Sequence, residues 1–405
     1  MILRARTVVT MDGAPIESGA VAINGNRIAA VGPAGGITGD GEVMDLGEVV
    51  LMPGLINAHC HLDYTMMRRA IAPPRSFTAW VQRINALKRS LDSTDYLTAI
   101  ERGFAELRRW GTTAVCNVEA FPELMLELAP SPIRTWWFYE MIDIRHRITT
   151  DDVVAGALSF FQHRANSLDS FGLSPHAPYT ASLALFHLAN ACATAFTMPL
   201  TTHVAESSEE YAMFTVQRGP LYDFMASLHR PMGDCHGETP FAHLWKSGAI
   251  HGGWLLAHMN ELSEADFELL ASLPRGTAPS IVHCPGSHRY FGHAPFQYRR
   301  LHDLGVNICT GTDSLASTES LSLFAELRRL SATEPWLSQE QLLRTVTVNP
   351  ARALGRRGTL GKLQAGALAD LIALPLSSTV ADIYEAIVNC DVPVSWMMID
   401  GKLVS

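Results

Sequence analysis

Two histidines one residue apart, His59 and His61, end an apolar stretch that begins at Leu55. In a β-strand, side chains alternate between the two faces, so residues two apart point the same way. If this stretch is a strand, both imidazoles project into one space at its C-terminal end. Two imidazoles in one space are half of the ligand set of a metal site, although a lone His-x-His pair also occurs on ordinary protein surfaces.

Similar residues end other apolar stretches further along the chain. In chain order they are His176, His203, His258, His283 and Asp313. Taken singly, each has an ordinary explanation. A histidine at a strand end is commonly a hydrogen-bonded structural group, and Asp313 could cap a following helix. Taken together with the His-x-His pair, the residues predict one shared site.

The pattern favours one divalent metal ion. Three imidazoles from His59, His61 and His203 and the carboxylate of Asp313 form a nitrogen and oxygen ligand set that suits zinc, with iron or manganese as alternatives. A fifth position is left for water, whose pKa a metal lowers from about 15.7 to about 7. A two-metal site would need a bridging anion, commonly a carboxylated lysine. The chain has four lysines, and none of them ends a central strand, so the sequence favours a single metal.

Two side chains are candidates for moving protons or stabilising charge beside the metal. Glu206 lies three residues, or one helical turn, after His203, and could lean over the metal without binding it. His258 could hydrogen-bond the attacking oxygen. The alternatives are that Glu206 is an acid at a helix N-terminus, where the helix dipole favours it, and that His258 is a packed core histidine.

The elements that must position these residues alternate between short strands and amphipathic helices. The predicted strands span residues 51–58, 112–118, 133–142, 171–175, 199–203, 253–258, 279–283 and 306–310. Eight strand–helix alternations over roughly 300 residues predict an α/β protein with a (β/α)8 TIM-type barrel, whose active site lies at the C-terminal ends of the strands. The alternative is an open doubly wound sheet. It lacks its best support, because no G-x-G-x-x-G motif follows a strand at the right place.

Both ends of the chain are rich in short strands separated by glycine-containing turns, and neither end carries an adequate core alone. This arrangement predicts a small β-sandwich domain built from both termini, residues 1–54 plus 356–405. Residues 55–355 remain for the catalytic barrel.

Composition narrows the choice of partners and location. The net charge is −9 and no basic cluster is present, which argues against binding to nucleic acid or to an anionic membrane. No apolar run approaches the ~20 residues of a membrane helix, and the first residues lack the apolar region of a secretory signal. The seven cysteines are scattered and form no C-x-x-C, which favours a reducing, cytoplasmic location over a disulfide framework.

As a set, the motifs resemble the amidohydrolase superfamily, in the branch that holds guanine deaminase, methylthioadenosine/S-adenosylhomocysteine deaminase, aminodeoxyfutalosine deaminase and the triazine chlorohydrolases. The matching segments are PGLINAHCH at 53–61, SPHAPYT at 174–180, HVAE at 203–206, LAH at 256–258, HCPGSH at 283–288, GTDS at 311–314 and NPARALG at 349–355. The resemblance covers essentially the whole chain. It is highly specific for the superfamily and much less specific for the substrate.

The resemblance implies a hydrolase acting on C–N bonds other than peptide bonds, of the cyclic amidine deaminase type. The expected reaction is hydrolytic deamination of an adenine-type nucleoside, of the aminodeoxyfutalosine or methylthioadenosine/S-adenosylhomocysteine type, with release of ammonia. Glu206 would relay a proton to a ring nitrogen, His258 would stabilise the attacking oxygen, and Asp313 would help to protonate the departing ammonia. The small-molecule substrate is the main expected partner, and a homodimer is a further expectation because relatives often form one.

Three alternatives remain at this point. The chain could deaminate guanine or another aminated heterocycle, or it could be a triazine-type chlorohydrolase or amidohydrolase. It could also be a non-catalytic binding protein, since a barrel fold alone never proves activity. The presence of Glu206 argues against the last reading, because a scaffold needs no acid beside a metal.

Four residues are candidate contacts for the substrate. His176 and Tyr179 lie on the loop that contacts the sugar side in the nucleoside deaminases that the chain resembles. Arg145 and Arg147 follow the predicted third strand. One of these arginines could bind a substrate carboxylate through the bidentate geometry that guanidinium favours, or both could be surface charges.

Three further candidate contacts rest on weaker signals. Trp80 falls in an amphipathic stretch, residues 76–91, which is either a lid that packs Trp80 near a base or a barrel-capping helix. His283 and His288 belong to the seventh-strand motif. His288 stands where relatives usually carry asparagine, which favours the aminodeoxyfutalosine type.

Overall fold

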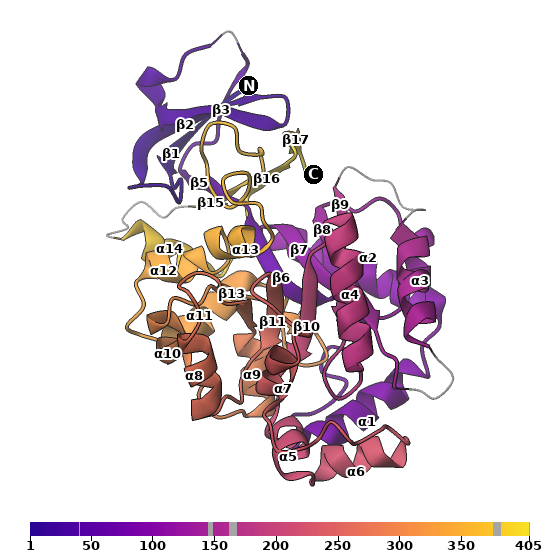
Figure 1. Ribbon diagram of the computed structural model, residues 1–405. Helices are drawn as coiled ribbons and strands as arrows, with labels where there is room; N and C mark the ends of the chain where they lie inside the picture. Colours follow the sequence, from indigo (N-terminus) through magenta and orange to yellow (C-terminus); the bar gives the residue numbers. More distant parts are fainter. Residues whose placement is uncertain (40, 145–148, 162–167, 376–381, 405) are drawn as a thin grey trace. The chain divides into compact units, whose positions relative to one another are not determined.

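The computed structural model describes residues 1–39, 41–144, 149–161, 168–375 and 382–404 (Figure 1). Arg145 and Arg147, predicted as substrate contacts, lie outside the described residues. The chain forms two compact units, one of residues 1–58, 104–115 and 320–405 and the other of residues 59–103 and 116–319. The two units are defined by compactness alone, so the predicted domain boundaries at residues 54 and 356 remain a prediction.

Strands from both ends of the chain form one sheet in the first unit. They are β1 (Ile2–Val8), β2 (Ile16–Asn24), β3 (Arg27–Pro33), β4 (Val43–Asp45), β5 (Val49–Pro53), β15 (Leu371–Pro375), β16 (Trp396–Ile399) and β17 (Lys402–Leu403). The order is β17-β16-β15-β5-β1-β2-β3, with β4 beside β1. The N-terminal and C-terminal strands meet where β5 pairs with β15 in antiparallel register. Apolar residues of both ends, including Leu3, Leu51 and Leu371, share one buried cluster, so neither end completes this core alone.

A second, nine-stranded sheet carries the residues singled out in the sequence. Its strands are β6 (Leu55–His61), β7 (Thr112–Glu119), β8 (Arg134–Met141), β9 (Asp169–Pro175), β10 (Leu200–Val204), β11 (Trp254–His258), β12 (Ser280–His283), β13 (Ile308–Thr310) and β14 (Asp313–Ser314). The order is β13-β12-β11-β10-β9-β8-β7-β6-β14. The two end strands, β13 and β14, are separated in the chain by only two residues, Gly311 and Thr312. The sheet therefore curls back on itself, as is consistent with the predicted TIM-type barrel.

Helices follow most of these strands, as the alternating pattern predicts. They are α1 (Phe77–Lys88), α2 (Ser93–Arg109), α3 (Thr150–Phe161), α4 (Leu183–Phe196), α5 (Ser208–Val216), α6 (Pro220–Ser227), α7 (Pro240–Lys246), α8 (Glu264–Ala271), α9 (Pro285–Phe291), α10 (Tyr298–Asp303), α11 (Leu323–Thr333), α12 (Gln339–Arg344), α13 (Val348–Ala353) and α14 (Ile383–Val388). Serine side chains cap the N-termini of α1, α4 and α8, where they accept hydrogen bonds from main-chain N–H groups. The caps set the start of each helix after its loop.

One predicted strand corresponds to parts of two observed strands. The apolar run 51–58 contains the end of β5 and the start of β6, which belong to different sheets. The chain passes from one to the other at Gly54, where an added Cβ would lie 2.0 Å from Thr113 Oγ1. A continuous apolar run does not reveal such a break, because strands of both sheets are buried here.

None of the described helices is both long and apolar enough to cross a membrane. All seven cysteines lie within the described residues, and no disulfide joins any of them.

Candidate metal centre and active site

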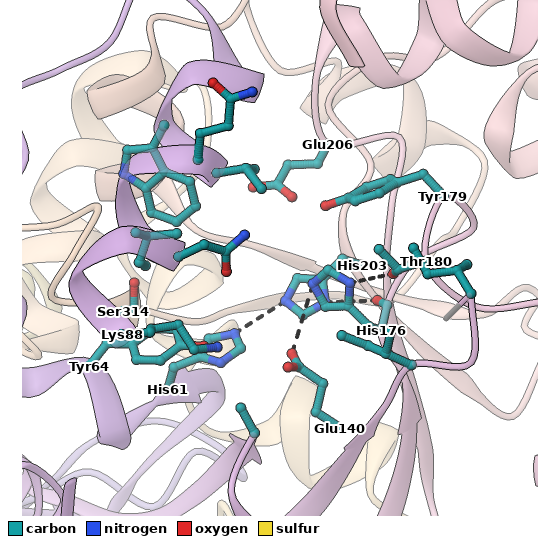
Figure 2. A pocket seen from close by; sticks show the side chains of 18 of the residues that line it. His61, Tyr64, Lys88, Glu140, His176, Tyr179, Thr180, His203, Glu206 and Ser314 are labelled. Atoms are coloured by element: carbon teal, nitrogen blue, oxygen red, sulfur yellow. Dashed lines mark hydrogen bonds and ion pairs between the residues drawn. The ribbon is translucent and has the colours of Figure 1, made fainter. Parts of the chain in front are cut away.

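The four predicted metal ligands lie close together, near the C-terminal ends of β6 and β10 and at the start of the short strand β14. His59 and His61 come from β6, His203 from β10 and Asp313 from β14, and all four are buried. The Nε2 atoms of His61 and His203 are 3.2 Å apart (Figure 2). Asp313 Oδ1 lies 3.8 Å from His59 Nε2 and 3.9 Å from His61 Nε2. Residues separated by up to about 250 positions in the sequence thus face one point.

The geometry fits a divalent metal ion. Zinc–nitrogen bonds of about 2.0–2.1 Å place two imidazole nitrogens on one ion roughly 2.9–3.4 Å apart. The 3.2 Å between His61 Nε2 and His203 Nε2 falls within that range. Burial lowers the pKa of His59 to about 3, and it lowers the pKa of His61 and of His203 below the usual imidazole value. The three imidazoles are therefore neutral near pH 7, which is the form that binds a metal.

Close approach of β14 to β6 completes this ligand set. Asp313 is paired in register with Cys60, between the two histidines of β6. The chain reaches this position through Gly311, where an added Cβ would lie 2.8 Å from the main-chain N and O of His59. Only glycine allows that approach. The alternative role of Asp313 as a helix cap is wrong, because Ser322 caps the next helix, α11.

Asp313 is held in a fixed orientation by its neighbours. Its Oδ1 accepts a hydrogen bond from the N–H of Ser314 at 2.7 Å, and its Oδ2 accepts one from Ser317 Oγ at 3.1 Å. Its main chain has a left-handed φ of 60°, which is uncommon for a residue other than glycine. Such conformations cost about 1–3 kcal/mol and cluster at functional sites. The surrounding hydrogen bonds therefore aim a strained residue at the histidines.

Glu206 and His258 lie together beside the four predicted ligands. Glu206 Oε1 lies 3.6 Å from His258 Nε2, and both side chains are buried. Burial raises the pKa of Glu206 well above its usual value, with the Asp313 charge as a further cause. The raised pKa favours the protonated carboxyl group, which is the form that donates a proton in general acid–base catalysis. The reading of His258 as a packed core histidine does not account for its place on a cavity wall next to this acid.

The position of Glu206 on the chain differs from the expectation of one helical turn after His203. β10 ends at Val204, and α5 begins only at Ser208 with Ser207 as its N-cap, so Glu206 lies in the connecting loop. The chain leaves the strand through Ala205, which has a left-handed φ of 51°. The loop, rather than a helix, turns the carboxyl group towards His258.

Two residues that the sequence did not single out hold the main chain of Glu206. The carboxylate of Glu210 accepts hydrogen bonds from the N–H of Ala205 at 3.2 Å and of Glu206 at 2.7 Å. Asn260 Nδ2 donates to the carbonyl of Glu206 at 2.9 Å. Both polar groups of the Glu206 peptide are therefore fixed by buried side chains, which limits the positions open to its carboxyl group.

A cavity of about 1200 Å³ opens above the site. His61, His203, Glu206, His258 and Asp313 all line it. Among the predicted substrate contacts, His176 and Tyr179 line it as well (Figure 2). Trp80 is a further lining residue. The volume exceeds the roughly 300–1,000 Å³ that is usual for small-molecule sites, so the cavity can hold a ligand of nucleoside size with room for a substituent.

His283 and His288 lie elsewhere. The ring of His283 stacks on Phe296 with centroids 4.0 Å apart, and its centroid lies 5.2 Å from that of His288. Neither histidine is among the described residues that line the cavity. Their role in substrate binding remains a prediction.

The cavity wall includes three polar residues that the sequence reasoning did not assign. Lys88 Nζ donates to Tyr64 Oη at 2.7 Å, and the Tyr64 ring is parallel to that of His61 with centroids 5.5 Å apart. Glu140 Oε1 lies 3.9 Å from His176 Nε2. The signal that could have found Glu140 is its place near the end of the third strand, where the carboxyl ends of a barrel carry functional groups.

A family model described as the amidohydrolase family matches residues 50–404 of the chain. A methylthioadenosine/S-adenosylhomocysteine deaminase from Syntrophobacter fumaroxidans is 31% identical over 390 residues, which cover 90% of this chain and 81% of that protein. The chain belongs to the amidohydrolase family. This membership confirms the resemblance seen in the sequence motifs, and it makes the protein a hydrolase that acts on carbon–nitrogen bonds.

Two further proteins resemble this amidohydrolase over most of their length. A methylthioadenosine/S-adenosylhomocysteine deaminase from Pyrococcus furiosus is 29% identical over 349 residues, which cover 82% of this chain and 77% of that protein. An adenosine deaminase from Xanthomonas campestris, solved with bound zinc, superposes with a TM-score of 0.86 at 26% identity, and covers 99% of this chain and 92% of that one.

Proposed function

We propose that this amidohydrolase is a mononuclear zinc-dependent deaminase of an adenine-type nucleoside. The observation that carries the proposal is the convergence of three neutral imidazoles and one carboxylate beside a buried acid, Glu206, at the base of a cavity of nucleoside size. The deaminase relatives and the zinc-bound adenosine deaminase support the same conclusion. Iron or manganese would suit the same ligands, and zinc is favoured because a structural relative holds it.

The reaction is hydrolytic replacement of an exocyclic amine by a carbonyl oxygen. A bound divalent metal lowers the pKa of a water ligand to about 7, which supplies a nucleophile at neutral pH. Glu206 donates a proton to the ring nitrogen next to the carbon that carries the amine, which makes that carbon electrophilic, and it regains a proton from the water. His258 Nε2, which lies 3.6 Å from Glu206 Oε1, hydrogen-bonds the oxygen as it bonds to the carbon. Asp313 takes up the remaining proton of that oxygen and passes it to the leaving nitrogen, so the C–N bond breaks and ammonia departs.

The cavity wall orients the substrate for this reaction. Trp80 and Phe77 on α1 and Tyr179 after β9 present aromatic surface, with the Phe77 ring 6.2 Å from Trp80 and 6.5 Å from Tyr179 between centroids. Such walls suit a flat heteroaromatic base, because aromatic rings pair favourably at these separations. His176 remains the proposed contact for the sugar side of the substrate.

We also propose the finer details of the architecture, location and assembly of the protein. The curled sheet is a (β/α)8 barrel, and the sheet built from both termini is a small β-sandwich. The protein acts in the cytoplasm on a small molecule without binding nucleic acid, and a homodimer is the expected assembly. The barrel and the sandwich rest on the strand order, and the location and the absence of nucleic-acid binding rest on the scattered cysteines and the net charge of −9. The homodimer rests on the resemblance to the family.

Ammonia release from purified protein tests the proposed substrate class. We expect release from at least one of adenosine, methylthioadenosine, S-adenosylhomocysteine and aminodeoxyfutalosine, with kcat/KM at least about 100-fold above that for guanine, because a pocket that meets a substrate's hydrogen-bonding groups strongly rejects ligands that lack them. Chloride release from a chlorinated triazine, measured in parallel, should stay at background. Turnover of guanine alone, or of the triazine alone, would favour the alternative functions instead.

A further inference from the structure

Glu140 is a buried acid in the cavity that the proposed reaction does not use. It lies near the C-terminal end of β8, its side chain is 7% exposed, and it lines the same cavity as Glu206. Figure 2 shows Glu140 and Glu206 on opposite sides of His203. The carboxylate is therefore placed to meet the part of a substrate that points away from Glu206.

No described residue satisfies this carboxylate with a hydrogen bond. His176 Nε2 lies 3.9 Å from Glu140 Oε1, which is too long for a hydrogen bond. His176 uses its other ring nitrogen, Nδ1, to bond Thr180 Oγ1 at 2.5 Å. The nearby cation Lys88 donates to Tyr64 Oη instead. A carboxylate is an acceptor only, so within the described part of the chain Glu140 offers open acceptor sites to whatever fills the cavity.

The proposed chemistry limits which group can meet Glu140. The reacting ring nitrogen must face Glu206, so the opposite edge of the base and its substituent extend towards Glu140 and His176. An adenine ring substituted with a sugar has no N–H donor apart from its reacting amine. An anionic substituent at this point would be repelled by the carboxylate. The hydroxyls of the sugar are the donors that remain, and a vicinal pair can engage both carboxylate oxygens.

We propose that Glu140 is a substrate-binding residue that accepts hydrogen bonds from the vicinal hydroxyls of the sugar and so selects ribonucleosides over deoxynucleosides and free bases. This assignment rests on the proposed function. It deepens that function by naming the part of the substrate that the enzyme recognises and the residue that recognises it.

The test compares adenosine with 2′,3′-dideoxyadenosine as substrates, and it uses the Glu140→Ala and Glu140→Gln variants. For the wild-type enzyme we expect kcat/KM to be about 10- to 100-fold higher for adenosine, because loss of both hydroxyls leaves a buried carboxylate unmet. In Glu140→Ala this ratio should fall to within about threefold of one, mainly through adenosine, and Glu140→Gln should lie in between. Asp152→Asn is the matched control, since Asp152 lines the same cavity but already accepts from Thr149 Oγ1 at 2.6 Å.

The outcomes separate this assignment from the proposed function. An unchanged ratio in Glu140→Ala, or an equal loss for both substrates, would overturn the role of Glu140 while leaving the deaminase intact. A preference for free adenine, whose ring N–H could meet the carboxylate, would also overturn it. Absence of ammonia from every nucleoside would overturn the proposed function itself. Zinc content, measured by elemental analysis, should stay at the wild-type value in each variant, so that loss of metal is not mistaken for loss of recognition.

Discussion

Replacing Glu206 with glutamine is expected to lower kcat about 10²- to 10⁴-fold, which is the usual contribution of general acid–base catalysis. Glutamine keeps the size of the side chain but cannot donate a carboxyl proton to the ring nitrogen. Metal content should not change, because Glu206 lies beside the ligands and contacts His258 at 3.6 Å rather than belonging to the ligand set. Activity would be measured as ammonia release, and metal content by elemental analysis.

Glu261→Gln provides the matched control for this variant. Glu261 is on the neighbouring loop, where its N–H donates to the carbonyl of Ala205, and its side chain does not line the cavity as the described residues define it. This variant should keep nearly full activity. Near-normal turnover in Glu206→Gln would remove the residue from the mechanism, and the proton would then have to come from another group.

Replacing Asp313 with asparagine is expected to lower both metal content and kcat. The change removes the only negative charge among the four proposed ligands and also removes the group that takes up a proton for the leaving ammonia. We expect kcat to fall at least about 100-fold, because the variant loses a metal ligand and a proton carrier together. The fold should be retained, since asparagine can still accept the hydrogen bond from Ser314 N–H.

Asp303→Asn is the matched control for the Asp313 variant. Asp303 is exposed at the end of α10 and pairs with its neighbour His302, at 3.3 Å between Oδ1 and Nδ1. It should keep full metal content and activity. A fully metal-loaded Asp313→Asn enzyme would contradict the ligand role, whereas full activity would contradict the catalytic role.

Much of this site could be predicted from the sequence because its residues sit at strand ends. Because side chains alternate between the two faces of a strand, a strand that ends in His-x-His places both imidazoles on one face. Parallel strands then bring their carboxyl ends to one side of a barrel, so His203, His258 and Asp313 could be assigned without knowledge of any contact. Seven of the eight predicted strands lie within about three residues of the observed ones for the same reason.

The residues that the sequence did not reveal act through contacts between distant segments or within loops. In the sequence, Glu210 is indistinguishable from other acidic residues in the first turn of a helix. Only the fold shows that its carboxylate accepts a hydrogen bond from the N–H of Glu206. Glu140 sits in an apolar run whose direction into the cavity depends on strand register. The break at Gly54 depends on a close approach to Thr113, which no local pattern encodes. Each of these features depends on tertiary packing, which the periodicity of the sequence does not reveal.

The central claim is that His59, His61, His203 and Asp313 hold one metal ion that the reaction requires. The most direct measurement treats the protein with a chelator, adds zinc back in known amounts, and follows ammonia release together with metal content. The account predicts that activity disappears without metal and rises linearly to a plateau at one zinc per chain. Full activity in the metal-free protein, or a plateau reached only at two zinc ions per chain, would contradict it.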